Sequence, residues 1–176
     1  SGTLPSRIRL IPPSFMLWQP FAYLLPVVPA LSLAVSDFRH RSIPAYGLAA
    51  FASCVLFTAV LMLPARTILY NMLTNVLLLG WMFGGVRLYL KARYPRRARS
   101  LGRYIGSGDV WFLLLLTPLF ALPLYVVLLL CGFACGLLYG TFVRIVARRE
   151  TTIPLVTFLS LPLIVCLSYR FYLSLP

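Results

Sequence analysis

Six runs of apolar residues, each long enough for a helix that crosses a lipid bilayer, dominate this chain. A bilayer core about 30 Å thick needs about 20 residues of α-helix. The runs cover residues 15–35, 45–63, 68–90, 105–122, 124–142 and 153–171. Hydrophobic residues make up 61% of the 176-residue chain, which is more than a soluble domain of this size can bury. We therefore predict one all-α membrane domain over residues 1–176, a bundle of six transmembrane helices.

Prolines predict where these helices bend or end. Pro20, Pro26 and Pro29 interrupt the first run and predict a bent helix, because each proline removes a backbone donor. The boundary between the fourth and fifth runs is marked only by Pro123. Inside the third run, a polar stripe predicts hydrogen bonds between helices. Its members are Asn71, Thr74 and Asn75.

The positive charges predict the orientation of the bundle. Twelve of the sixteen Lys and Arg residues fall in three segments, residues 39–41, 87–103 and 144–149. The other four, which lie toward the opposite ends of the runs, are Arg7, Arg9, Arg66 and Arg170. Cytoplasmic loops of membrane proteins are enriched in Lys and Arg. We therefore expect these three segments in the cytoplasm, both termini outside it, and a multi-pass protein of the cytoplasmic (inner) membrane.

The net charge of +13 indicates membrane lipids as partners rather than nucleic acid. Basic cytoplasmic segments are attracted to anionic headgroups, and no nucleic-acid recognition motif accompanies the charge. The four cysteines all lie within apolar runs, none forms a CxxC pair, and the chain has one histidine. Structural metal sites need several such ligands. We therefore expect no metal site.

Two aspartates stand out in this basic, apolar chain. Asp37 and Asp109 are the only aspartates, and with Glu150 they are all of its acidic residues. An ionisable carboxyl near a bilayer is costly unless it is paired or hydrated, so it indicates a function. With the predicted orientation, Asp37 follows the first helix and Asp109 opens the fourth. Both are therefore expected at the cytoplasmic side.

Each aspartate stands in a distinctive segment. Residues 36–45 read SDFRHRSIPA, and residues 105–110 read IGSGDV, which contains the pattern GxGD. Gly106 and Gly108 lack side chains, so they permit either a tight loop or the close approach of an extended substrate. The sequence leaves these two roles open.

Together these motifs resemble the prepilin peptidases, GxGD aspartic proteases of the membrane that include the archaeal preflagellin peptidases. The resemblance covers residues 15–171 in motif order and topology. It rests on Asp37 followed by basic residues and Ile43-Pro44, on residues 106–109 in the fourth of six runs, and on IPLVTFL at residues 153–159.

The resemblance implies an aspartic endopeptidase that removes the short basic leader of type IV prepilin-like proteins at the cytoplasmic face. It implies that Asp37 and Asp109 are catalytic and that no metal or organic cofactor takes part. Larger bacterial members carry a CxxC-containing insertion and methylate the new N-terminus, and this chain lacks that insertion, so we expect no methyltransferase activity. We expect Gly106, Gly108, Ile43 and Pro44 to shape the site. The candidates for tuning or gating it are His40, Arg41 and Arg103.

Two positions depart from the family pattern. Ala45 stands where members often have Asn or Asp, and Trp111 stands where they often have Lys. These departures leave open a catalytically silent relative that acts as a scaffold. A transporter or proton-conducting protein is a further alternative, because intramembrane carboxyls mark ion paths.

Acid–base hydrolysis of a peptide bond needs one carboxylate and one carboxylic acid. Two neighbouring carboxyls supply both, because like charges at short range cannot both ionise easily. Asp37 is expected at a helix C-terminus, which disfavours an anion, and Asp109 at a helix N-terminus, which favours one. The sequence therefore predicts Asp109 as the base and Asp37 as the acid.

Overall fold

All regular structure in the described part of the chain is helical. The structure is a computed structural model that describes residues 21–93, 106–147 and 154–173. Its elements are α2 (Val27–His40), α3 (Ala45–Met62), α4 (Ala65–Arg93), α5 (Ser107–Leu116), α6 (Leu122–Ala147) and α7 (Leu155–Leu173). Four of them, α3, α4, α6 and α7, are long and apolar enough to cross a membrane. The prediction of an all-α membrane protein is thus confirmed at this level.

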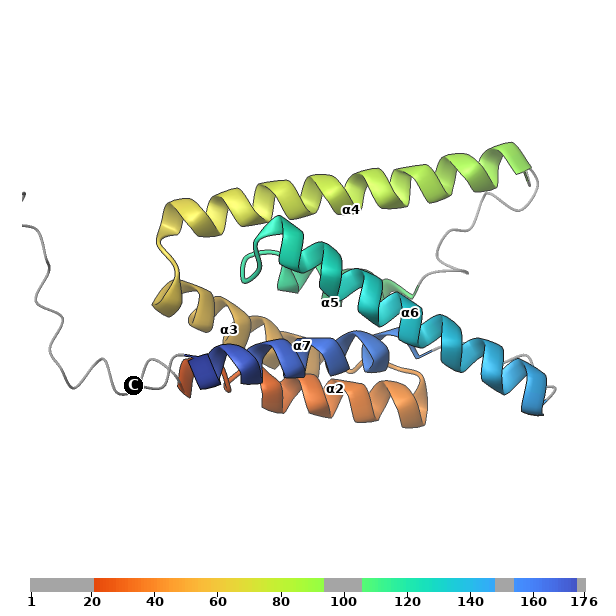
Figure 1. The fold of residues 1–176 in the computed structure, drawn as a ribbon, viewed down its shortest axis with the longest axis horizontal. Coiled ribbons are helices and arrows are strands. Elements are labelled where there is room, and N and C mark those ends of the chain that lie inside the picture. Colours follow the sequence, from red (N-terminus) through yellow and green to blue (C-terminus); the bar gives the residue numbers. More distant parts are fainter. Residues whose placement is uncertain (1–20, 94–105, 148–153, 174–176) are drawn as a thin grey trace, which may run out of the picture.

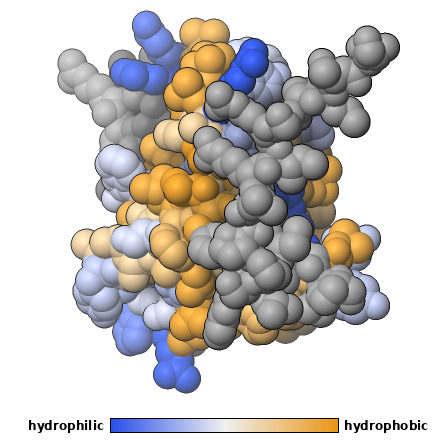
Figure 2. All heavy atoms as spheres, turned by 90° about the vertical axis from the view of Figure 1, so that its left-hand side faces the viewer, coloured by the Kyte–Doolittle hydropathy of each residue, from blue (hydrophilic) through white to orange (hydrophobic). Residues whose placement is uncertain are grey.

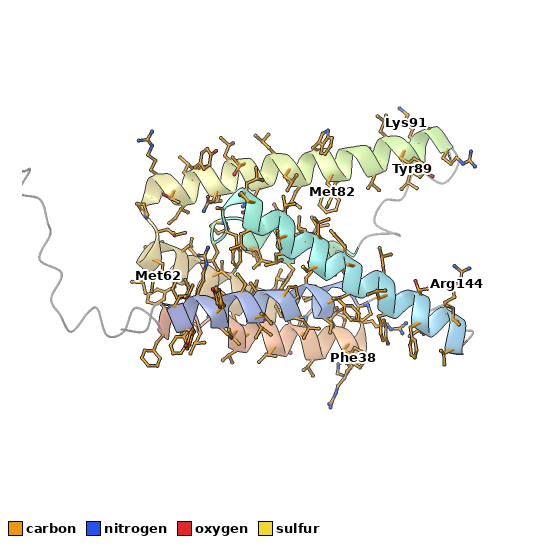
Figure 3. All side chains as sticks on the ribbon, viewed as in Figure 1. Phe38, Met62, Met82, Tyr89, Lys91 and Arg144 are labelled. Atoms are coloured by element: carbon orange, nitrogen blue, oxygen red, sulfur yellow. The ribbon has the colours of Figure 1, made fainter. Side chains whose placement is uncertain are left out.

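The helices run alternately in opposite directions along one bundle axis (Figure 1). One end of the bundle carries the turn between α3 and α4, and the other carries the ends of α2, α4 and α6 (Figure 1). Figure 3 shows Met62 at the first end and Phe38, Lys91 and Arg144 toward the second. We call the second the basic end, because the last turns of α2, α4 and α6 carry cations there.

Helix α7 lies at the centre of the packing, mainly against α6 and α2. Gly132 of α6 lets α7 come close, because a Cβ at this position would lie 2.5 Å from Cδ2 of Leu159 and 3.1 Å from its Cα. This contact agrees with the close helix packing that glycines spaced by four residues favour in membranes. Many large hydrophobic side chains are exposed, among them Leu69, Leu77 and Leu88 of α4. Figure 2 shows hydrophobic side chains across the middle of the end that carries Met62.

The first predicted helix is interrupted by a turn rather than bent, and the helix after the turn extends further than predicted. Turns at residues 23–26 precede α2, which begins at Val27 directly after Pro26. The helix continues to His40, five residues beyond the predicted end of the first run, and residues 15–20 lie outside the described part. Asp37 therefore lies in the last turn of α2 instead of following the helix.

The fourth predicted span is wrong as a single helix over residues 105–122. Helix α5 ends at Leu116, and a turn through residues 117–121 leads into α6 at Leu122. The cause is tertiary, because α4 supplies donors for the carbonyl groups of this turn. Nδ2 of Asn75 donates to the carbonyls of Thr117 (3.0 Å) and Phe120 (2.7 Å).

The predicted polar stripe on α4 thus acts mainly between helices. Nδ2 of Asn71 also reaches the carbonyl of Pro118 at 3.5 Å, whereas the hydroxyl of Thr74 bonds only carbonyls of its own helix. Aromatic stacking holds the middle of α5, where the rings of Phe51 on α3 and Phe112 lie 4.9 Å apart at 12°. These contacts fix the helix that carries Asp109.

Replacing Asn75 by Leu is expected to lower the free energy of unfolding by about 2 kcal/mol, because two buried carbonyls lose their donor. Denaturant unfolding in detergent micelles measures this change. Thr74→Val is the matched control on the same stripe and is expected to cost much less. Equal losses in the two variants would contradict the role given to Asn75.

Candidate active site

Asp37 is buried beneath the first turn of α7. Only 7% of its surface is exposed, although its helix ends three residues later. Oδ2 of Asp37 accepts hydrogen bonds from the backbone N–H of Thr157 (3.1 Å) and from its hydroxyl (3.3 Å). The first N–H groups of a helix have no partner within it. Asp37 therefore acts as an N-cap for α7, supplied by a different helix.

This arrangement affects the ionisation of the Asp37 carboxyl. Asp37 lies outside the four helices that are long enough to span a membrane. Burial raises the pKa of Asp37, and hydrogen bonds from Thr157 and the N–H of Val156 act in the opposite direction. The positive end of the α7 dipole also favours an anion at this position. Burial thus opposes ionisation of the Asp37 carboxyl, and the first turn of α7 favours it.

Asp109 lies in the first turn of α5, also outside those four helices. A backbone hydrogen bond from Gly106 supports its carboxylate, as in the N-terminal capping of a helix. Burial and the charge of Asp37 nevertheless raise the pKa of Asp109 to about 6. The structure therefore brings the two aspartates together at the basic end, close enough for one to affect the ionisation of the other.

The two glycines of the GxGD segment leave room rather than provide unusual backbone angles. No glycine in the described residues has a positive φ. A Cβ on Gly108 would lie 2.5 Å from Cδ1 and 3.0 Å from Cβ of Ile43, so the start of α5 packs directly on the loop after α2. A Cβ on Gly106 would lie 3.0 Å from Oδ2 of Asp109. At Gly108 the missing side chain leaves room for Ile43, a role besides the tight loop and the substrate approach that the sequence left open.

The loop between α2 and α3 brings Ile43 to this contact. Arg41 adopts a left-handed conformation (φ 51°), and its N–H closes α2 by donating to the carbonyl of Asp37 at 2.9 Å. The hydroxyl of Ser36 donates to the carbonyl of Ser42 at 3.0 Å. Pro44 then precedes the first residue of α3. Ile43 and Pro44 thus lie where site-shaping residues are expected.

The structure adds a contact to Asp37 that the expected division of roles between the aspartates left out. The prediction placed the base at Asp109 because it considered only the helix that carries each residue. In the structure Asp37 also lies at the N-terminus of α7, which donates hydrogen bonds to it. The charge on Asp37 raises the pKa of Asp109, and the hydrogen bonds from α7 favour the ionised form of Asp37.

Thr157 is the site residue that the sequence did not single out. It belongs to IPLVTFL, but nothing in that segment shows that its third helical residue meets an aspartate 120 positions earlier. Of the three candidates for tuning or gating the site, His40 and Arg41 are exposed at the end of α2. Arg103 lies outside the described residues. Ala45 and Trp111, the two departures from the family pattern, are also exposed.

The raised pKa of Asp109 gives a testable effect on stability. Between about pH 4 and pH 6 the folded protein holds this proton more tightly than the unfolded chain. Stability from this group is therefore present at acid pH and is lost as the pH rises through about 6. Asp109→Asn is expected to raise the free energy of unfolding by about 1 to 2 kcal/mol at neutral pH, with little change at pH 4, because solvent screens part of the effect at this partly exposed carboxyl. Denaturant titrations at the two pH values measure the difference, and equal effects would contradict it.

Compared with protein-family models, curated proteins and solved structures, the chain matches none of them.

Proposed function

We propose that this protein is a membrane aspartic endopeptidase. It removes the short basic leader of type IV prepilin-like proteins at the cytoplasmic face of the cytoplasmic membrane, without methylating the product. The observation that carries this proposal is the convergence of the chain's only two aspartates from α2 and α5 into one partly buried site. One carboxyl is supported as an anion by α7, and the other is biased toward its protonated form.

Hydrolysis by this pair follows from their protonation states. Asp37 removes a proton from a water molecule as the water oxygen bonds to the scissile carbonyl carbon, and Asp109 gives its proton to the carbonyl oxygen. Asp37 then passes its proton to the leaving nitrogen as the C–N bond breaks. The new carboxyl group forms as the hydroxyl proton returns to Asp109. The pair ends in its starting state, with one water added across the peptide bond.

The depth of the site supports cleavage at a membrane surface. Helix α3 is about 27 Å long at 1.5 Å per residue, close to the thickness of a bilayer core. The aspartates lie toward its first residue, at the basic end. Exposed aromatic side chains, typical of the lipid–water boundary, occur at Phe38, Tyr46 and Trp111. In this proposal the basic end faces the cytoplasm, because cytoplasmic segments of membrane proteins are enriched in Lys and Arg.

The same placement argues against a transporter. Carboxyls on an ion path lie near the middle of the membrane between spanning helices, whereas Asp37 and Asp109 lie at one end of the bundle. Ala45 and Trp111, the two departures from the family pattern, have exposed side chains. In this proposal they bear on substrate preference more than on the chemistry.

Reconstitution of the full chain in lipid vesicles tests the proposal. The substrate is a synthetic peptide with a basic leader joined to an apolar helix, and mass spectrometry detects the released leader. A pH-sensitive dye inside the vesicles detects proton flux in the same preparation. Cleavage at the leader junction without flux is the expected result. Flux without cleavage would favour the transporter, and neither activity would favour a silent scaffold.

A further inference from the structure

The hydroxyl of Thr157 lies between two acceptors that it cannot serve at the same time. Its Oγ1 is 2.9 Å from the carbonyl oxygen of Ala34 and 3.3 Å from Oδ2 of Asp37. A threonine hydroxyl carries one hydrogen and can also accept hydrogen bonds. The backbone N–H of Thr157 donates separately to Oδ2 of Asp37 at 3.1 Å. The side chain is therefore a second donor to Asp37 that can turn away.

We propose that Thr157 is a positioning residue that sets which aspartate loses its proton first. When Asp37 is ionised, the hydroxyl of Thr157 donates to it. When Asp37 is protonated, the hydroxyl donates to the carbonyl of Ala34 and accepts from the carboxylic acid. This change of hydrogen-bond partner follows from the two contacts of the Thr157 hydroxyl and does not depend on the reaction. Its consequence for catalysis rests on the proposed function.

The change of partner by the Thr157 hydroxyl matters because Asp37 must change charge during hydrolysis. The carboxylate needs support before water is activated, and the same support would resist the proton that Asp37 then takes up. A donor that turns to a backbone carbonyl removes this resistance without leaving its own hydrogen unpaired. The N–H of Thr157 keeps the carboxyl in place throughout.

Other charged and titratable groups near Asp37 are present in every variant compared below. They are Arg39 and His40 on α2, Arg41 in the loop after α2, Asp109 on α5, Tyr46 at the start of α3 and Tyr139 of α6, whose ring packs on Phe38. Among the described residues of α7, the ionisable side chains lie beyond Leu163, toward the other end of the helix. A comparison of Thr157→Val with Thr157→Ser therefore isolates the hydroxyl.

The chain offers a direct measurement, because it has only two aspartates. Cell-free synthesis with aspartate labelled with ¹³C at the side-chain carboxyl gives two signals, and Asp109→Asn assigns them. In the wild type, the Asp37 signal is expected to titrate at lower pH than the Asp109 signal. Thr157→Val keeps the side-chain shape and the backbone N–H, and it is expected to raise the pKa of Asp37 by about one unit. Thr157→Ser is expected to titrate like the wild type.

Wild-type titration in the Thr157→Val variant would overturn the proposal, as would a shift of equal size in Thr157→Ser. Circular dichroism confirms that each variant is folded, and Thr157→Ser remains informative if the valine variant does not fold. Leader cleavage gives the second readout, with the acid limb of kcat/KM expected to move up by about one pH unit in Thr157→Val. If the titration shifts but the wild type cleaves nothing, the proposed function fails alone. If the wild type cleaves and the titration does not shift, the role of Thr157 fails alone.

Discussion

Asp37→Asn and Asp109→Asn are each expected to lower the rate of leader cleavage by about a thousandfold or more. A positioned acid or base contributes about 10²- to 10⁴-fold to a rate. The amide in Asp37→Asn cannot take a proton from water, and the amide in Asp109→Asn has no acidic proton to give. Neither change alters the size of the side chain much. Cleavage of the synthetic substrate in vesicles measures both losses.

Asparagine is the informative replacement because it preserves the structural role of each residue. Its Oδ1 can still accept the N–H of Thr157 at position 37, and that of Gly106 at position 109. Both variants are therefore expected to fold. Glu150→Gln is the matched control, since Glu150 is the only other acidic side chain, and it is expected to leave cleavage unchanged. Retained cleavage in either aspartate variant would defeat the proposed mechanism.

Gly108→Val is expected to lower cleavage by about a hundredfold, because the first turn of α5 must move away from Ile43 to make room. The added Cβ alone would lie 2.5 Å from Cδ1 of Ile43. A displacement of about 1 Å at a catalytic group can cost about 10²-fold in rate. Asp109 follows directly after Gly108, so it moves with this turn. The cleavage rate per folded protein measures the effect.

A smaller substitution at the same position provides a rescue test. Gly108→Ala is expected to reduce cleavage, and Ile43→Val is expected to restore part of it, because removing Cδ1 relieves the shortest contact. Gly80→Ala is the control, since a Cβ at Gly80 on α4 meets nothing within 4 Å. If Gly108→Ala lowers cleavage equally with Ile or Val at position 43, packing between this loop and α5 is not the cause.

The sequence predicted those parts of the fold that depend on length and composition. Helix α3 begins where expected and ends within one residue of the predicted bound. An apolar run of bilayer length must satisfy its backbone hydrogen bonds without water, and a helix does so within the run. The placement of both aspartates at one end also followed from local patterns. The order of apolar runs and basic segments fixes which helix ends lie together.

The errors arose where one helix depends on another. Helix α5 ends at Leu116 because Asn71 and Asn75 of α4 satisfy the turn that follows, and hydropathy does not register such donors. The hydrogen bonds that favour an ionised Asp37 were missed because the first turn of α7 reaches this residue across 120 positions of sequence. No local pattern around Asp37 carries this information. Thr157 was missed as a site residue for the same reason.

The pH dependence of kcat/KM for leader cleavage by the wild-type protein tests the central claim most directly. This ratio reports the ionisation of the free enzyme. If Asp109 must be protonated while Asp37 is ionised, cleavage should fall as the pH rises through about 6, where Asp109 loses its proton, and fall again at acid pH, where Asp37 gains one. A rate that stays constant between about pH 5 and pH 8 would contradict catalysis by this pair.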